Sequence, residues 1–241
     1  GSLQFKGQYR HSALGVLWQF LTPLILVVLF YVVFTTFRYS GNDLLWLSLC
    51  VGIFTYVYLE NSIIGGSMCI VNNAQLVKKT NFPRELIAVS HIVINFITYL
   101  IIINIIIGLS LSSGVSISLT NIIIVIPIIA LMVIFSMGAI LLLSAIVVYI
   151  RDIGHFMLAI SRMVFWTAPT VYTVYDVSGL LEALLWCNPM TWYIAPLQDI
   201  ICFNITPSLT VLMGSFVISI IFIVVGPIVF AKLKNGFAER L

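Results

Sequence analysis

The chain has 241 residues, of which 61% are hydrophobic and only 8% are charged, and its net charge is +3. Soluble domains carry about 25% charged residues, so this composition excludes a soluble globular protein. The apolar runs reach the length of about 20 residues that a membrane-spanning helix needs, and the basic residues form no stripe typical of nucleic-acid binding. The sequence therefore predicts an all-α integral membrane protein. No repeat or linker divides it, so residues 1–241 are expected to form a single transmembrane domain.

The beginning of the chain differs from the long apolar runs that follow. Residues 3–13 mix apolar and basic side chains, which predicts an amphipathic helix lying on the membrane surface. The chain starts with Gly1-Ser2 rather than methionine, so we expect native residues to be missing before Leu3. Six membrane-spanning helices are predicted after this interface helix, at about residues 14–37, 44–70, 87–111, 121–149, 155–175 and 209–231.

A polar stretch, residues 72–85, separates the second and third predicted spans, and we call it the elbow. Asparagines at its start can cap a short helix. Lys78 and Lys79 suit the C-terminal end of that helix, where the backbone dipole is negative. Pro83 disfavours helical geometry at Phe82, so the chain should break there and restart. We expect the elbow to expose basic and apolar groups that have no internal role and that a cytoplasmic partner can bind.

Residues 176–208 hold two short apolar pieces, 180–187 and 192–203, which are interrupted by prolines. Neither piece is long enough to cross a membrane. We expect two short helices that dip into the outer half of the membrane. Cys187 and Cys202 share this segment, which leaves a disulfide between them open.

The distribution of basic residues predicts the orientation of the chain. Six spans place both termini on one side of the membrane, together with the elbow. Nine of the eleven lysines and arginines fall on that side, whereas Arg38 lies on the other and Arg162 lies within a span. Because basic residues concentrate on the cytoplasmic side, we expect both termini and the elbow in the cytoplasm. The outward segment 176–208 carries only acidic charges, Asp176, Glu182 and Asp199.

The sequence contains no catalytic or metal-binding pattern. It has no G-x-x-x-x-G-K-[ST] motif, so this chain is expected neither to bind ATP nor to be an enzyme. Its four cysteines and three histidines lack metal-ligand spacing, so no metal site is expected. The ionisable residues within the spans are Glu60 and Arg162, too few for membrane-embedded catalysis. Charges in a span are costly, so Arg162 either snorkels to the cytoplasmic interface, lines a pathway or pairs with Glu60.

Aromatic residues accumulate in the second and fifth predicted spans. Rings near helix ends often anchor a protein at the membrane interface. Rings within the spans can instead form a smooth wall, because the C–H faces of sugars pack on aromatic faces and phenol hydroxyls bond to sugar hydroxyls. The candidates for lining a channel are Tyr56, Tyr58, Glu60, Phe165, Trp166 and Tyr172.

Several motifs occur together in a characteristic order. They are FKGQYRHSALGVLWQFLTPL (residues 5–24), NAQLVKKTNFPRE (73–85), VYIRDIGH (148–155), APTVY (168–172), NPMTWYIAPLQD (188–199) and FAERL (237–241). Together they resemble the permease subunit of bacterial ABC type 2 polysaccharide exporters, which export O-antigen, capsule or teichoic acid. The resemblance covers nearly the whole chain. Gln198 stands where this family often has arginine, and Ala168 stands where serine often precedes the proline.

This resemblance implies a homodimeric, multi-pass permease in the bacterial inner membrane, joined to two separate ATPase subunits that bind ATP and magnesium. It also implies an interface helix at 3–13, a coupling helix in the elbow and two outer gate helices in 177–203. The substrate would be a lipid-pyrophosphate-linked glycan. The residues expected to couple to the ATPase are Asn73, Leu76, Lys78, Lys79, Phe82, Pro83, Arg84 and Glu85.

The implied pyrophosphate requires cationic donors, and arginine offers a rigid bidentate fork. The candidates near the depth of the inner headgroups are Lys6, Arg10 and Arg162. Lys6 and Arg10 have a simpler interpretation as well, because basic residues at this depth attract any anionic lipid.

Other functions stay open at this point. An ABC type 2 exporter of a small molecule or lipid would share the same architecture. A secondary transporter should show internal repeats and helices broken at the membrane midplane, and neither is clear in this sequence. A membrane acyltransferase or glycosyltransferase would need a cluster of catalytic groups, which the spans lack.

Overall fold

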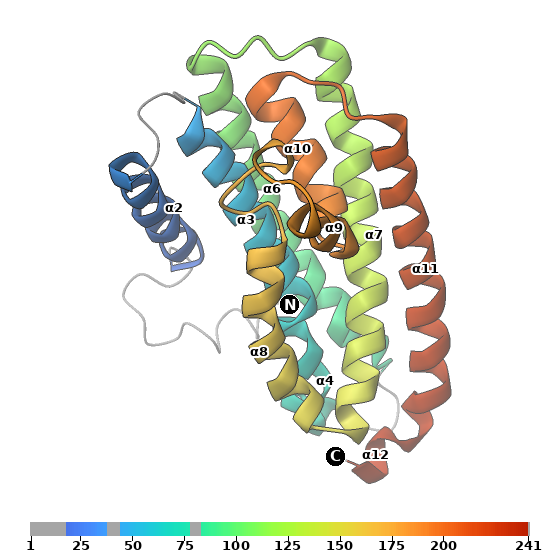
Figure 1. Ribbon diagram of the computed structural model, residues 1–241. Helices are drawn as coiled ribbons and strands as arrows, with labels where there is room; N and C mark the ends of the chain where they lie inside the picture. Colours follow the sequence, from blue (N-terminus) through green and yellow to red (C-terminus); the bar gives the residue numbers. More distant parts are fainter. Residues whose placement is uncertain (1–17, 38–43, 78–82, 241) are drawn as a thin grey trace.

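The computed structural model describes residues 18–37, 44–77 and 83–240, and within them every regular element is a helix (Figure 1). This confirms the predicted all-α class. The longer helices are α2 (Trp18–Phe37), α3 (Leu45–Ile63), α6 (Glu85–Ser112), α7 (Leu119–Tyr149), α8 (Asp152–Thr167) and α11 (Leu209–Leu233). The shorter ones are η2 (Gly65–Met68), α4 (Cys69–Asn72), α5 (Ala74–Val77), η3 (Val174–Asp176), α9 (Leu180–Cys187), α10 (Thr191–Phe203), η4 (Lys234–Gly236) and α12 (Phe237–Arg240).

Four of the described helical segments are long and apolar enough to cross a membrane. They are Leu45–Asn72, Glu85–Ser112, Leu119–Tyr149 and Leu209–Gly236. They correspond to the second, third, fourth and sixth predicted spans. In α2 the described apolar stretch, Phe20–Thr36, is shorter than the others. The count of six spans therefore stays a prediction beyond these four helices.

The fifth predicted span, 155–175, is wrong in its extent. α8 has 16 residues, so it measures about 24 Å and is shorter than the hydrocarbon core of about 30 Å. It begins at Asp152 and ends at Thr167. Pro169 is the reason, because a proline disfavours helical geometry in the residue before it. Ala168 accordingly has an extended backbone, with φ −94° and ψ 153°.

α7 and α11 pack closely along their length (Figure 1). A β-carbon on Gly138 of α7 would overlap the backbone of Phe222 in α11, and one on Gly226 would overlap Gly138. The hydroxyl of Ser219 donates to the carbonyl of Leu131 at 2.9 Å. Small residues and interhelical hydrogen bonds hold membrane helices together, because lipid supplies no hydrophobic drive for their association.

α3 is the central helix of the bundle. It contacts α2, α6, α7 and α10, and Leu47 and Leu59 on it are completely buried. By contrast, α6 exposes an apolar stripe at every fourth residue, Ile97, Ile101 and Ile105. Residues four apart share one face of a helix, so this stripe is suited to face lipid.

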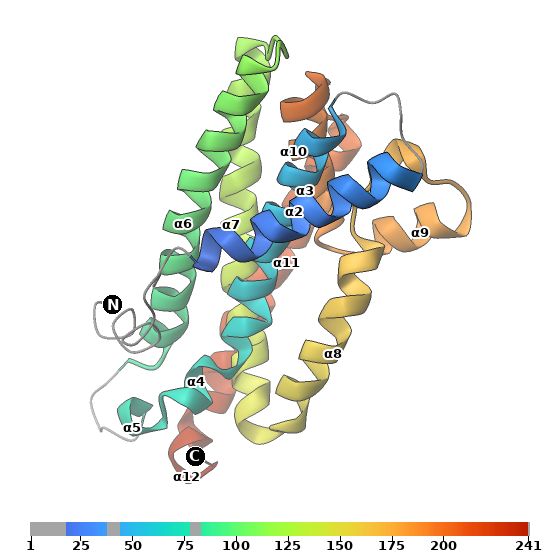
Figure 2. The same cartoon turned by 90° about the vertical axis from the view of Figure 1, so that its left-hand side faces the viewer.

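The two ends of the bundle carry different elements. One end, the lower end in Figures 1 and 2, carries α4, α5, α12 and the turn between α7 and α8, and we call it the elbow end. The α6–α7 and α10–α11 connections lie at the opposite end, which we call the outer end. α2 crosses the other helices obliquely (Figure 2). The elbow and the C-terminal helix thus share one end of the molecule.

α9 and α10 occur where the two short helices were predicted. They have 8 and 13 residues, so neither can cross a hydrocarbon core of about 30 Å. Gly179 precedes α9 with φ 67°, and Asn204 ends α10 with φ 53°, a conformation that these two residue types tolerate. Cys187 is exposed, Cys202 is buried, and both are free thiols, so the disulfide left open by the sequence is not formed.

Candidate functional site

An aromatic cluster joins α2, α3 and α8. The ring centroid of Phe165 lies 6.0 Å from that of Phe30 and 5.1 Å from that of Tyr56. It lies 5.5 Å from that of Trp166, whose side chain is 56% exposed. The hydroxyl of Tyr56 donates to the backbone carbonyl of Ser161, which links α3 to α8. We call these four rings the aromatic face: Phe30, Tyr56, Phe165 and Trp166. Tyr56 is only 2% exposed, so it supports the ring of Phe165 from behind and presents no surface of its own.

Tyr58 lies on the other side of α3. Its ring centroid is 4.8 Å from that of Tyr99 and 6.5 Å from that of Phe96, and both of these residues belong to α6. Only 4% of Tyr58 is exposed. Residues two apart on a helix point about 200° apart, so the structure does not bring Tyr58 together with Tyr56.

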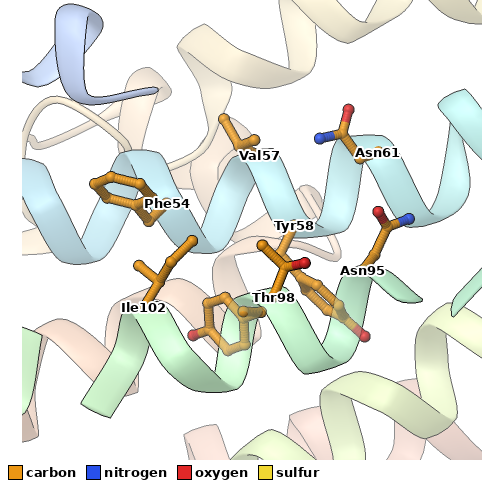
Figure 3. A pocket seen from close by; sticks show the side chains of 8 residues that line it. Phe54, Val57, Tyr58, Asn61, Asn95, Thr98 and Ile102 are labelled. Atoms are coloured by element: carbon orange, nitrogen blue, oxygen red, sulfur yellow. The ribbon is translucent and has the colours of Figure 1, made fainter. Parts of the chain in front are cut away.

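A small crevice lies between α3 and α6 beside Tyr58 (Figure 3). Its volume is about 30 Å³, which is room for about one water molecule. Asn61 and Asn95 lie at the same end of it in Figure 3. The volume excludes a sugar ring, so this crevice is not a glycan path. Its lining consists of Phe54, Val57, Tyr58, Asn61, Asn95, Thr98, Tyr99 and Ile102.

The two ionisable residues predicted within spans lie near each other in the fold but do not pair. Glu60 is one helical turn from Tyr56, and the hydroxyl of Tyr56 donates to the carbonyl of Ser161 in α8. Arg162 follows Ser161 and is exposed. In the part of the chain that the structure describes, no ion pair joins Arg162 to Glu60. Of the three sequence-based interpretations, snorkelling and lining a pathway therefore remain for Arg162.

The connection after α8 is held in place by side-chain hydrogen bonds to backbone carbonyls. Tyr172 donates from its hydroxyl to the carbonyl of Trp166 at 2.7 Å, which folds the connection back onto the end of α8. Gln198 of α10, which is 2% exposed, donates from Nε2 to the carbonyls of Ser48 and Pro169, at 3.2 and 3.0 Å. Gln198 occupies a position where this family often has arginine. Its two hydrogen bonds connect α10 to α3 and to the segment between α8 and α9.

At the elbow end, the C-terminal segment closes onto the start of α6. The Nζ of Lys234 lies 2.7 Å from Oε1 of Glu85. The guanidinium of Arg84 donates to the carbonyl of Lys234 and lies 5.9 Å from the ring centroid of Phe237. Phe237 is completely buried, with its ring centroid 5.4 Å from that of Phe230. We call this set the C-terminal clamp: Arg84, Glu85, Lys234 and Phe237.

The C-terminal clamp corrects the expectation that the groups of the elbow have no internal role, because Arg84 and Glu85 both have partners within the chain. The Lys234–Glu85 ion pair is 39% and 38% exposed at its two ends, so it contributes at most about 1 kcal/mol. Burying the Phe237 side chain contributes more, about 1.5–3 kcal/mol. Apolar packing is therefore the main force that holds the C-terminal segment to the elbow.

The rest of the elbow follows the predicted pattern where it is described. α5 covers Ala74–Val77, and the side-chain amide of Asn73 donates to the carbonyl of Cys69, the first residue of α4. Pro83 is exposed, and α6 begins two residues later, as expected for a break at that proline. Leu76 lies in α5. Five further candidates lie outside the described residues: Lys6, Arg10, Lys78, Lys79 and Phe82.

Three residues of these sites were not predicted as site residues from the sequence. Phe30 lies in a uniformly apolar helix, where no local signal distinguishes one ring from another. Lys234 and Phe237 belong to the C-terminal tail, and the FAERL motif was the available signal for Phe237. Among the described residues, no group of three or more His, Cys, Asp or Glu side chains is placed to hold a metal ion.

Comparison with known proteins agrees with this architecture. The chain matches the ABC-2 type transporter family over residues 2–202. It is 28% identical over 237 residues to the O-antigen export system permease protein RfbA of Klebsiella pneumoniae, covering 98% of this chain and 91% of that protein. The protein of the same name from Myxococcus xanthus is 24% identical over 242 residues, covering 99% and 92%. Because the family match extends over most of its length, the chain belongs to the ABC-2 type transporter family.

Proposed function

We propose that this chain is the transmembrane subunit of an ATP-driven exporter that moves a lipid-pyrophosphate-linked polysaccharide from the cytoplasmic side of the bacterial inner membrane. The observation that carries the proposal is the similarity along almost the whole chain to permeases named for O-antigen export. Two copies would form the pathway, and two ATPase subunits would bind ATP and magnesium. Both termini and the elbow would face the cytoplasm. α2, together with α8 and the connection that follows α8, would complete six spans in each copy.

The aromatic face supports a glycan as the cargo. Trp166 presents 56% of its surface beside the packed ring of Phe165, and Met163 on the same helix is 72% exposed. A second copy packed against α2 and α8 would cover this apolar surface and enclose the aromatic face between the two chains. An exposed aromatic surface would let sugar C–H faces slide past, because they can pack against the faces of the rings.

The elbow is proposed as the surface that receives the ATPase. Lys78 and Lys79 lie between α5 and α6 in sequence, so a partner bound there would act on the start of α6. The C-terminal clamp joins that start to η4 and α12 through Arg84 and Glu85. A displacement of the elbow would therefore reach α11 as well as α6.

The pyrophosphate headgroup is proposed to meet Lys6, Arg10 and Arg162. Arg162 lies ten residues after Asp152, the first residue of α8, so it is about 15 Å from the elbow end of that helix. It is exposed, which leaves its guanidinium accessible to a phosphate.

The proposed function predicts that glycan will be trapped inside cells that lack this chain. In a strain deleted for its gene, lipid-linked glycan should accumulate on the cytoplasmic leaflet and surface glycan should disappear. Expression of the chain with its ATPase should restore surface glycan, measured by immunoblot on intact cells. The matched control is the same chain paired with an ATPase variant that binds but does not hydrolyse ATP. Unchanged surface glycan in the deletion strain, with export of a lipid or small molecule lost instead, would reject the polysaccharide assignment.

Trp166→Ala is expected to lower the export rate several-fold, because this exposed aromatic ring can pack against the C–H face of a sugar and alanine removes that contact. Trp166→Phe should retain most of the rate, since it keeps an aromatic surface. Phe216→Ala in α11 is the control, because Phe216 is also exposed, at 49%, but lies outside the aromatic face. Equal export rates for Trp166→Ala and Phe216→Ala would show that the aromatic face does not line the pathway.

A further inference from the structure

A cavity at the outer end is not used by any of the sites described above. Its volume is about 370 Å³, which falls within the range of about 300–1,000 Å³ typical of small-molecule sites. It is walled by η3, α9, α10, the connection from α10 to α11 and the first turn of α11. These elements are the short, non-spanning part of the fold together with the start of the last long helix, so the cavity lies away from the elbow end.

The lining combines two aromatic rings with oxygen-bearing side chains. Tyr175 is 61% exposed and Trp186 is half-buried, so both rings leave surface available to a ligand. The ring of Trp186 is supported from behind by Trp192, at 4.9 Å between centroids, and Trp192 donates from Nε1 to the carbonyl of Trp186 at 3.0 Å. The oxygen-bearing residues of the lining are Glu182, Asp199, Thr206 and Ser208.

Asp199 is positioned before any ligand arrives. It is 9% exposed on α10, so packing holds its carboxylate in place, close enough to Tyr175 to act on that hydroxyl electrostatically. Burial raises the pKa of Tyr175, and the neighbouring Asp199 carboxylate raises it further, so this hydroxyl keeps its proton. A carboxylate held in this way retains lone pairs that can accept from the hydroxyls of a ligand.

The charge of the cavity restricts the class of ligand. Its lining holds two carboxylates, Glu182 and Asp199, and no basic residue. No lysine, arginine or histidine occurs in the sequence between Arg162 and Lys232. Phosphates and uronic acids would therefore be repelled, whereas an uncharged ligand that offers several hydroxyls and an apolar ring face would fit.

We propose that this outer cavity binds a neutral sugar residue of the glycan as the chain leaves the permease. The inference rests on the proposed function, and it adds a binding site on the side opposite the elbow. The rings of Tyr175 and Trp186 would receive the C–H face of the sugar, and Glu182 and Asp199 would accept from its hydroxyls. Binding should be weak, with Kd on the order of 1 mM, because each residue of a moving polymer must also be released.

Binding is tested on the permease–ATPase complex in nanodiscs by saturation-transfer difference NMR. The probes are neutral tetrasaccharides of glucose, mannose, galactose and rhamnose, together with tetragalacturonate as the anionic probe. At least one neutral probe should show transfer and tetragalacturonate should show none. Transfer to no neutral probe, or equal transfer to the anionic one, would overturn the proposal.

Variants then locate the binding in this cavity. Trp186→Ala should weaken binding of the neutral probe at least several-fold, and Glu182→Gln should weaken it while also admitting tetragalacturonate. Glu182 is exposed, so its substitution is not expected to disturb folding and provides a test if Trp186→Ala is unstable. The control is Leu184→Ala, because Leu184 lies on the same helix, is 46% exposed and does not line the cavity. Unchanged binding and selectivity in Glu182→Gln would place the sugar elsewhere.

The failure of this inference can be separated from failure of the proposed function. A wild-type complex that restores glycan export but binds no neutral probe would overturn the cavity assignment alone. A wild-type complex that binds the probe in a Glu182-dependent way but does not restore export would support the cavity and reject the exporter assignment.

Discussion

Gly138→Ala is expected to separate α7 from α11 and to destabilise the folded permease. The added methyl group would overlap backbone atoms of Phe222, which cannot rotate away as a flexible side chain would. The helices must therefore move apart, and the hydrogen bond from Ser219 to the carbonyl of Leu131 must stretch with them. Alanine gains about 1 kcal/mol over glycine in helix propensity, but overpacking costs about 1–3 kcal/mol or more, so the net effect is destabilising.

The measurement is the yield of monodisperse protein and its thermal unfolding temperature in detergent. Gly108→Ala in α6 is the matched control, because no atom lies within 4 Å of a β-carbon at that position. The control should be as stable as the wild type or more stable. A Gly138→Ala protein as stable as Gly108→Ala would show that α7 and α11 do not approach as closely as described.

The facing glycine provides a second arm of this test. A β-carbon on Gly226 would overlap Gly138 itself, so Gly226→Ala should destabilise to a similar degree. The two changes act on one helix contact, and the first methyl group already forces the separation that the second needs. The double variant should therefore lose less stability than the sum of the losses measured for the two single variants.

Phe237→Ala is expected to release the C-terminal segment from the elbow and to reduce association with the ATPase. Phe237 is completely buried, and replacing a buried phenylalanine by alanine usually costs about 3–5 kcal/mol. The Lys234–Glu85 ion pair cannot compensate, because an exposed pair contributes at most about 1 kcal/mol. Loss of the ring also removes the support for the guanidinium of Arg84 at the start of α6.

The test combines two readouts on the same membranes. Thermal unfolding reports the loss of packing, and co-purification of the ATPase subunit reports the position of the elbow. Phe216→Ala is the matched control, since that ring is 49% exposed on α11 and its removal should change neither readout strongly. If Phe237→Ala destabilises the permease but retains full ATPase association, the C-terminal clamp is structural only and does not position the elbow.

The helices themselves could be predicted because hydropathy is a local property. Long apolar runs must be helical in a membrane, where each backbone polar group needs a partner within its own segment. The predicted short pieces at 180–187 and 192–203 correspond to α9 and α10 for the same reason. The end of α8 could also have been predicted, because Pro169 marks it. The apolar residues beyond the proline instead led to a predicted helix that is too long.

The grouping of side chains was decided by the tertiary structure. Tyr56 and Tyr58 look equivalent in the sequence, but one faces α8 and the other α6, because the neighbours of α3 differ on its two sides. Arg84 appears to be a free basic residue until the C-terminal segment, about 150 residues later, folds back onto it. The outer cavity likewise requires η3, α9, α10 and α11 to meet. Composition and periodicity thus determined which segments are helices, whereas long-range packing determined which faces those helices share, since local sequence carries no information about the partner on the other side.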